Sequence, residues 1–277
     1  WYPRKKYPQR DTSIREAGEP YAITKEDGIA IGESNSARAL RELHPGAIYL
    51  HKGLQYRIIK LDMTDKRAVC RPAGDVNFHT RPITNEESEI VSITDERKLK
   101  GVQINLGMLK ITERVTGYIK KNMQTNENLG EFPLELPASV FTTMGIWVKV
   151  DPDALSEIKS LSYSTSGSLH AVEHAAIATL PLFALCDRMD LGGVSYAFNH
   201  ELGSPAIFIY DGHEGGVGLT KKGFECAPEW FDATNRIMAE CPCEVSCPSC
   251  TQDPKCGNNN DPLDKRGAMM ILKGWMG

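Results

Sequence analysis

The sequence predicts an α+β fold with a β-rich N-terminal half, forming a small barrel or a bent antiparallel sheet, and a mixed α/β C-terminal half. Short apolar and β-branched runs separated by turns fill the chain up to about residue 150. Long apolar and amphipathic runs with helical spacing dominate from residue 151 onward. Five cysteines then fall between positions 241 and 256. We expect a basic connecting arm over 1–20, a β-rich module over 21–150 and a cysteine-bearing module over 151–277.

The β-rich half contains recognisable turns and caps. Asp27-Gly28 between apolar runs predicts a hairpin. Ser34, Asn35 or Ser36 predicts the cap of a short helix over 36–43 that stops at His44-Pro45-Gly46. Further strands are expected over 47–51, 55–61, 67–71, 89–93, 102–104, 114–119 and 141–150. Their order and short connections favour antiparallel pairing.

The second half begins with Asp151-Pro152, which predicts a helix starting near residue 154. Residues 168–186 are apolar on nearly all faces, so this helix belongs in a core, and Pro181 should kink it. Strands over 194–198 and 206–210 and helices over 217–239 and 262–273 complete the expected elements.

Composition limits the class of protein. The chain has 277 residues, 41% hydrophobic and 25% charged, which is ordinary for a folded protein. No apolar run approaches the roughly 20 residues that span a bilayer, so no membrane partner is expected. The first residues lack the apolar core of a signal peptide and an initiator methionine, so we expect a cytoplasmic protein and a piece of a longer chain.

The cysteine cluster is the strongest chemical feature. Cys247-Pro-Ser-Cys250 is a CxxC knuckle, and thiolates at such spacing hold zinc in a tetrahedron. We expect one structural zinc bound by Cys243, Cys247, Cys250 and Cys256, with Cys241 as an alternative ligand. An iron–sulfur cluster is the competing cofactor because four thiolates also suit it. Four thiolates would leave no position for water, which favours a structural role.

Two other motifs have competing interpretations. His170-x-x-Glu173-His174 is the inverzincin arrangement of a metallohydrolase, but its apolar helix equally suits buried, hydrogen-bonded polar residues. The glycine-rich stretch 210–218 lacks the Gly-Lys-Ser/Thr ending of a nucleotide-binding loop, so a structural turn is the leading interpretation. A contact of that turn with a nucleic-acid phosphate or a neighbouring domain is the alternative.

Basic residues with interleaved aromatics occur twice in the chain, although its net charge is −4. Such sets can follow a phosphate backbone and stack on bases, but they also occur on solvated faces. The candidate nucleic-acid-binding residues are Arg4, Lys5, Lys6, Arg114, Lys120 and Lys121.

Several stretches resemble one family closely. The cysteine cluster with its continuation Cys256-Gly-Asn-Asn-Asn260, Glu173-His174, the stretch 186–193 and the stretch 209–216 are similar to the MrfA zinc-binding (MZB) domain. That domain closes a family of mitomycin repair factor A-like DEAD/DEAH-box DNA helicases. The upstream stretches 1–3, 43–51 and 115–118 resemble the region that lies after the motor in those proteins. The family's four-cysteine site maps onto Cys243, Cys247, Cys250 and Cys256.

The resemblance implies an accessory, zinc-binding and DNA-binding or structural region of an ATP-driven 3′–5′ helicase of crosslink repair. Its expected partners are single-stranded or junction DNA and the motor domains of the same full-length protein, which bind the ATP. The motor's Gly-Lys-Thr loop and Asp-Glu-Ala-His-like box are absent from this chain, so it should not hydrolyse ATP by itself. A metallohydrolase using His170, Glu173 and His174, or a protein-interaction platform, are the alternatives.

Overall fold

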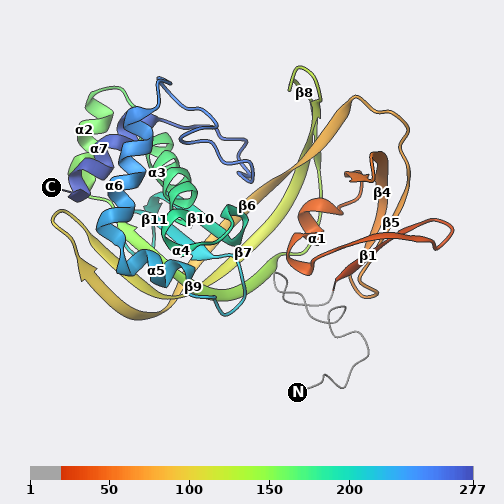
Figure 1. Ribbon diagram of the computed structural model, residues 1–277, viewed down its shortest axis with the longest axis horizontal. Coiled ribbons are helices and arrows are strands. Elements are labelled where there is room, and N and C mark those ends of the chain that lie inside the picture. Colours follow the sequence, from red (N-terminus) through yellow and green to blue (C-terminus); the bar gives the residue numbers. More distant parts are fainter. Residues whose placement is uncertain (1–19, 277) are drawn as a thin grey trace. The chain divides into compact units, whose positions relative to one another are not determined.

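A computed structural model describes residues 20–276 of the chain, except for the side chain of Ala37 (Figure 1). The predicted basic arm therefore lies, apart from Pro20, outside the described residues. The chain forms two compact units. Unit 1 comprises the described residues up to Thr84 together with Arg114–Ser139, and unit 2 comprises Asn85–Glu113 together with the described residues from Val140. The sequence-based boundary near 150 stays a prediction.

Unit 1 is built on a five-stranded sheet with the order β2-β1-β5-β4-β3. Its strands are β1 (Tyr21–Lys25), β2 (Ala30–Ser34), β3 (Ile48–His51), β4 (Leu54–Asp62) and β5 (Arg67–Pro72). Only β1 and β5 pair in parallel within this sheet. The helix α1 (Ser36–Glu42) begins at Asn35, whose side chain accepts the Arg38 amide. Ala39 and Leu43 of this region are fully buried with Ile23 and Ile58, so helix and sheet share one core.

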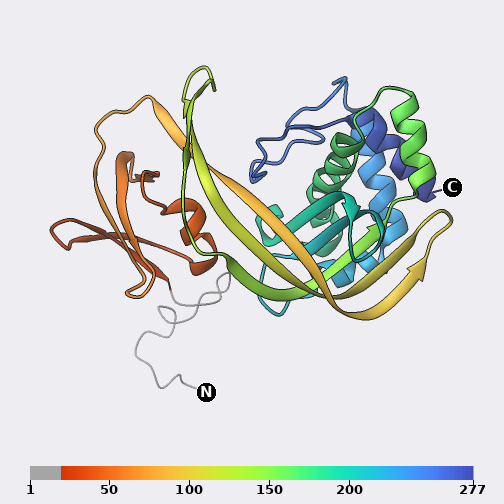
Figure 2. The same ribbon diagram turned by 180° about the vertical axis from the view of Figure 1, so that it is seen from behind.

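Two long strands contribute residues to both units. They are β6 (Phe78–Lys98) and β7 (Gln103–Asn122), which run as neighbouring ribbons (Figure 2). The remaining strands are β8 (Asn128–Pro133), β9 (Ser139–Lys149), β10 (Leu191–Asn199) and β11 (Ser204–Asp211). The second sheet has the order β10-β11-β9-β7-β6, and β8 pairs with β7.

The sheet of unit 2 is apolar on both faces. Along β11, Ile207 and Ile209 join a core cluster with the helices, whereas Phe208 and Tyr210 join a cluster with Trp147 on the opposite face. This alternation follows from the two-residue period of a strand. The helices that cover the first face are α2 (Pro152–Ser160), α3 (Thr165–Thr179), α6 (Ala227–Glu240) and α7 (Lys265–Met276) (Figure 1).

The predicted α+β class is confirmed, and several elements depart from their expected bounds for local reasons. The helix expected over 168–186 ends at Thr179, and Pro181 begins the short α4 (Pro181–Ala184). A 3-10 turn, η2 (Arg188–Asp190), then leads into β10. The helix expected over 217–239 is divided into α5 (Leu219–Glu225) and α6, because Pro228 lacks the amide that would continue the first helix. No helix among residues 20–276 is long and apolar enough to cross a membrane.

Candidate metal centre and neighbouring sites

Four thiols gather where α6 ends. Cys241 follows the last residue of α6 in an extended conformation, and the chain then turns so that the sulfurs of Cys241, Cys243, Cys247 and Cys250 lie within 4.8 Å of one another. The Sγ–Sγ distances are 3.4 Å for Cys241–Cys247, 3.4 Å for Cys243–Cys250 and 3.6 Å for Cys247–Cys250. Zinc–sulfur bonds of about 2.3 Å in a tetrahedron place sulfurs about 3.8 Å apart. The spacing therefore fits four ligands of one ion, and all eight cysteines are free of disulfides.

The backbone and a lysine support this cluster. The Cys247 carbonyl accepts the amides of Cys250, Thr251 and Gln252, which forms the tight turn of the CxxC knuckle. Lys265 reaches in from α7 with only 5% of its surface exposed. Its Nζ donates to the carbonyl oxygens of Cys241 and Cys243 at 2.6 and 2.7 Å. A buried ammonium beside four thiolates offsets part of the negative charge that the ligands would carry around Zn²⁺.

Burial and interactions among the clustered thiols shift the pKa values of Cys243 and Cys247. Burial raises the pKa of Cys243 to about 12, and hydrogen bonds with Cys250, Cys247 and Cys241 add to the rise. Burial would raise the pKa of Cys247 as well, but hydrogen bonds from Cys241 and the Ser249 amide lower it to about 6. Cys247 therefore ionises before Cys243, and a metal would have to displace the remaining protons.

Cys256 lies apart from this cluster, so the fold does not bring together the ligand set expected from the sequence. Its Sγ is 3.4 Å from Nε2 of His170, and it groups with His170 and His174 of α3. The physical reason is the path of the chain. The residues after Cys250 pack against α3, and Cys241 enters the first cluster directly from α6.

The two histidines are held by backbone carbonyls. Nδ1 of His170 is 2.9 Å from the Pro262 carbonyl, and Nδ1 of His174 is 2.9 Å from the Thr251 carbonyl. Because a carbonyl oxygen only accepts, each Nδ1 carries the proton and each Nε2 has a lone pair. Burial lowers the pKa of both rings, that of His174 to about 4, which favours their neutral form.

The side chain of Glu173, the glutamate of the His-x-x-Glu-His motif, contacts β10. Its carboxyl group bonds with Ser195 of β10, and burial raises its pKa to about 8. A Cβ on Gly193 of β10 would lie 2.9 Å from Cγ of Glu173, so only glycine leaves room for this side chain. Glu173 is therefore not positioned as the general base of a His-x-x-Glu-His metallohydrolase, and the arrangement matches the buried, hydrogen-bonded alternative.

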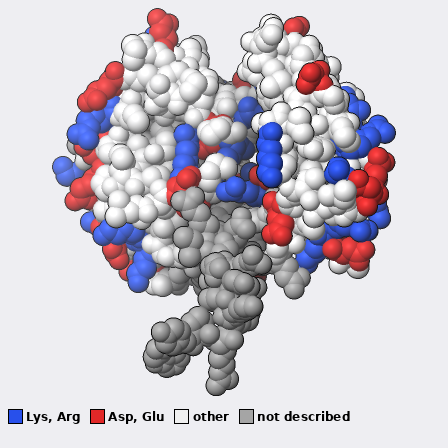
Figure 3. Space-filling view, turned by 45° about the vertical axis from the view of Figure 1, so that its right-hand side comes forward, with Lys and Arg blue, Asp and Glu red and all other residues white. Residues whose placement is uncertain are grey.

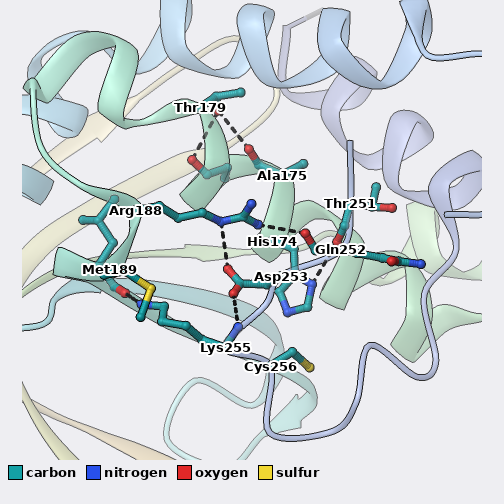
Figure 4. A network of polar contacts seen from close by, with 12 residues as sticks. His174, Ala175, Thr179, Arg188, Met189, Thr251, Gln252, Asp253, Lys255 and Cys256 are labelled. Atoms are coloured by element: carbon teal, nitrogen blue, oxygen red, sulfur yellow. Dashed lines mark hydrogen bonds and ion pairs between the residues drawn. The ribbon is translucent and has the colours of Figure 1, made fainter. Parts of the chain in front are cut away.

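A charged network fixes the loop that carries Cys256 (Figure 4). The Asp253 carboxylate, almost fully buried, accepts Nε of Arg188 at 3.0 Å and the Lys255 amide at 2.6 Å. Arg188 also donates to the Gln252 carbonyl. Asn260 exchanges hydrogen bonds with the Asp253 backbone. These contacts tie the loop to η2 and hold its turns in place.

The carboxylate of Asp211 binds the backbone amides of the glycine-rich turn before α5. Asp211 is fully buried at the end of β11. It accepts the amides of Val217, Gly218, Leu219 and Thr220 at 2.7–3.1 Å. These are the donors that an incoming phosphate would need. The geometry agrees with a structural turn, and sequence reasoning missed Asp211 as its organising residue.

The candidate basic residues occupy different environments. Arg4, Lys5 and Lys6 lie outside the described residues. Arg114 on β7 is exposed, whereas Nζ of Lys120 lies 4.0 Å from the ring centre of Phe132. Lys121 is buried, and burial followed by the charge of Arg81 lowers its pKa.

Two further residues of unit 1, His79 and Arg81, lie near the candidate basic residue Lys121. Burial lowers the pKa of His79, and the charges of Lys121 and Arg81 lower it further. Both His79 and Arg81 belong to β6, where no basic run marks them in the sequence.

On the face drawn in Figure 3, basic side chains lie among acidic ones rather than in one continuous field.

Residues 172–251 match the model of the MrfA Zn-binding domain. The matched segment contains His174 and the four clustered cysteines 241, 243, 247 and 250, and it stops before Cys256.

The chain belongs to the MrfA Zn-binding family.

Its relatives in this family extend over different parts of the chain. It is 31% identical over 251 residues to the ATP-dependent helicase YprA of Bacillus subtilis, covering 88% of this chain and 33% of the relative. It is 40% identical over 108 residues to the uncharacterized protein MJ1572.1 of Methanocaldococcus jannaschii, covering 38% of this chain and 96% of the relative. A crystal structure of the helicase MrfA bound to DNA is similar with a TM-score of 0.62 at 26% identity. That likeness covers 98% of this chain and 36% of MrfA, so the chain spans about a third of these helicases.

Proposed function

We propose that the chain is the C-terminal accessory region of an ATP-dependent DNA helicase, where it holds one structural zinc in the four-thiol cluster and helps to bind DNA. The observation that carries this proposal is the four-thiol cluster inside the segment that matches the MrfA Zn-binding domain. The likeness over almost the whole chain to a helicase solved with DNA supports it.

The proposed ligands are Cys241, Cys243, Cys247 and Cys250. Three of their six sulfur–sulfur separations are 3.4–3.6 Å and all lie within 4.8 Å, which suits a single ion. An iron–sulfur cluster places several metal ions and bridging sulfides between its cysteines, so it needs a wider arrangement of thiolates. Zinc with four thiolates has no position left for water. The ion would then link the end of α6 to the loop that precedes α7.

The DNA contacts are proposed for unit 1 and for the basic arm. Arg114 is exposed, and Lys120 places its ammonium over Phe132, beside Phe78 at 5.3 Å. Basic and aromatic side chains in one place suit the backbone and bases of single-stranded or junction DNA. Lys121, next to Arg81, and the arm residues Arg4, Lys5 and Lys6 complete the candidate set.

The finer functional assignments rest on the family resemblance. They are 3′–5′ translocation, repair of crosslinked DNA, a cytoplasmic location and packing against the motor of the same protein. This chain alone is expected to lack ATPase activity. The amides of its glycine-rich turn are bound to Asp211, and the sequence has no Gly-Lys-Ser/Thr loop.

The test is binding of the zinc-loaded chain to fluorescent single-stranded, duplex and junction oligonucleotides at a series of salt concentrations. We expect binding that weakens steeply with salt, because phosphate contacts release counterions. We also expect no DNA-stimulated ATP hydrolysis. Absence of binding at low salt would favour the protein-interaction platform, and ATP hydrolysis by the purified chain would contradict the accessory role.

A further inference from the structure

We propose that His170, His174 and Cys256 form a second zinc site, separate from the four-thiol cluster. The three ligand atoms lie within 4.8 Å of one another, and Nε2 of His170 is 3.4 Å from Sγ of Cys256. Bond lengths of about 2.0 Å to nitrogen and 2.3 Å to sulfur in a tetrahedron put these atoms about 3.5 Å apart. The separation of His170 Nε2 and Cys256 Sγ therefore matches that of two ligands of one shared ion, and the third ligand atom lies within 4.8 Å of both.

Two backbone carbonyls orient the imidazoles of His170 and His174 as zinc ligands. In each ring, Nδ1 donates its proton to a backbone carbonyl, of Pro262 for His170 and of Thr251 for His174. This leaves Nε2 as the atom with a lone pair, and it is His170 Nε2 that faces the sulfur. Histidines bound to zinc commonly have such an acceptor on their second nitrogen, because it fixes the ring and the tautomer. The ring centres lie 4.2 Å apart on successive turns of α3.

A backbone amide contacts the sulfur of Cys256, the third proposed ligand. The Asn260 amide donates to Sγ of Cys256 at 3.3 Å, an interaction that stabilises a thiolate. Asn259 and Asn260 both have left-handed backbone conformations, with φ of 57° and 61°, which turn that amide back toward the sulfur. Asparagine adopts this conformation more readily than other residues with a side chain, so the turn holds the amide on the sulfur without marked strain.

The second site differs chemically from the first. It offers two neutral imidazoles and one thiolate, so Zn²⁺ would keep one positive charge there and a fourth position for water. The buried carboxylate of Asp253, held by Arg188, lies close enough to interact electrostatically with both histidines and would offset that charge. On binding, the ion replaces the proton of the Cys256 thiol, which leaves for solvent. The ion would connect α3 with the loop that follows the first cluster.

The test is metal content and cobalt spectroscopy on the whole chain, purified under reducing conditions. We expect about two zinc ions per wild-type chain by mass spectrometry of the metal. When the metal-free chain is titrated with Co²⁺, absorption should change up to two equivalents. One of the two sites should show about a quarter of the sulfur-to-cobalt intensity of the other, because it has one thiolate rather than four.

Two variants assign the second ion. Cys256→Ser and His174→Ala should each lose one zinc and keep the strong four-thiolate cobalt absorption, whereas Cys186→Ser, a free thiol outside both clusters, should keep both ions. A wild-type chain that saturates at one equivalent overturns the proposal, even if the variants fail to fold. Two ions retained in Cys256→Ser would overturn it as well. The outcome is independent of DNA binding and of the helicase assignment.

Discussion

The carboxylate of Asp211 accepts both the amide and the hydroxyl of Thr220, each at 2.8 Å. Together with the amides of residues 217–219, these donors surround one buried charge at the start of α5. An internal carboxylate thus occupies the place that an anionic ligand takes at many helix starts. The turn joins β11 to the helical layer, and the Asp211 carboxylate satisfies its amides.

Replacing Asp211 by alanine should destabilise unit 2 severely. The change leaves the buried amide of Thr220 and the part-buried amides of residues 217–219 without their acceptor, and each bond to a charged group contributes about 1.5–3 kcal/mol. Because the losses are not additive, we expect a decrease of about 3–5 kcal/mol in the free energy of unfolding, measured by urea denaturation. Asp232→Ala, an exposed position on α6, is the control and should change it by less than about 0.5 kcal/mol. Equal effects of the two changes would contradict the role of Asp211.

The choice between Cys241 and Cys256 as a ligand of the four-thiol site has a direct test. Cys241→Ser should abolish the four-thiolate cobalt absorption, because it removes a sulfur 3.4 Å from Cys247. Cys256→Ser should preserve it. The reverse pattern would restore the ligand set expected from the sequence. Cys226→Ser serves as the control, since this thiol donates to the Lys222 carbonyl outside the cluster.

Lys265 should strengthen zinc binding without touching the ion. Lys265→Met keeps most of the unbranched side chain but removes the charge and the bonds to the carbonyls of Cys241 and Cys243. We expect zinc affinity to fall about 10–100-fold in competition with a chromophoric chelator. Lys273→Met, an exposed position on the same helix, is the control. Unchanged affinity in Lys265→Met would show that the lysine only fills space.

His44 should make unit 1 sensitive to acid. Burial lowers the pKa of this imidazole, against a smaller opposing effect of its bond to the Pro45 carbonyl. The unfolded imidazole takes up a proton as the pH falls below about 6.5, whereas the folded one does so only at lower pH. Protons then favour the unfolded state, so stability is present above that pH and is lost as the pH falls.

The measurement is the thermal midpoint at pH 7.5 and pH 5.5 for the wild type, His44→Asn and the exposed control His200→Asn. We expect a smaller acid-induced decrease in His44→Asn than in the other two proteins. Any acid release of metal affects all three alike, so the difference between them reports His44. An identical decrease in all three would contradict the prediction.

Arg114 and Lys120 should contribute phosphate contacts. For each of Arg114→Ala and Lys120→Ala, we expect weaker binding to all DNA sequences and a decrease of about 1 in the slope of log affinity against log salt. Lys120→Arg keeps the charge near Phe132 and should retain most of the slope. Lys100→Ala, an exposed lysine of unit 2, is the control. Slopes unchanged in both alanine variants would remove these residues from the DNA contacts.

Local signals predicted local structure well. Asp27-Gly28 marks a hairpin that exists between β1 and β2, and Asp151 followed by Pro152 caps α2 as expected. The full length of β6 was not predictable, because its burial pattern is irregular and many of its 21 residues are exposed. Such a strand has no apolar period, and its pairing with β7 is a matter of tertiary structure.

The ligands of the four-thiol site likewise could not be chosen from the sequence alone. Spacing alone allows Cys241 or Cys256 to complete the four-thiol site, since both lie within a few residues of the CxxC knuckle. The decision depends on where α6 ends and on the position of α3, whose His170 lies 86 residues before Cys256 in the sequence. The sequence did single out His170 and His174, but their partner could be found only from the fold.

The hydrogen bonds of the two histidines have a consequence for biosynthesis. The acceptors of His174 and His170, at Thr251 and Pro262, follow them by 77 and 92 residues. A ribosome therefore completes α3 long before it adds the groups that satisfy these rings. During that interval the helix that becomes the centre of unit 2 has two exposed polar rings, and unit 2 is expected to reach its final packing only after the last part of the chain has been synthesised. A chain that stops before Pro262 would lack this final step, and we expect it to be a target for quality-control proteases.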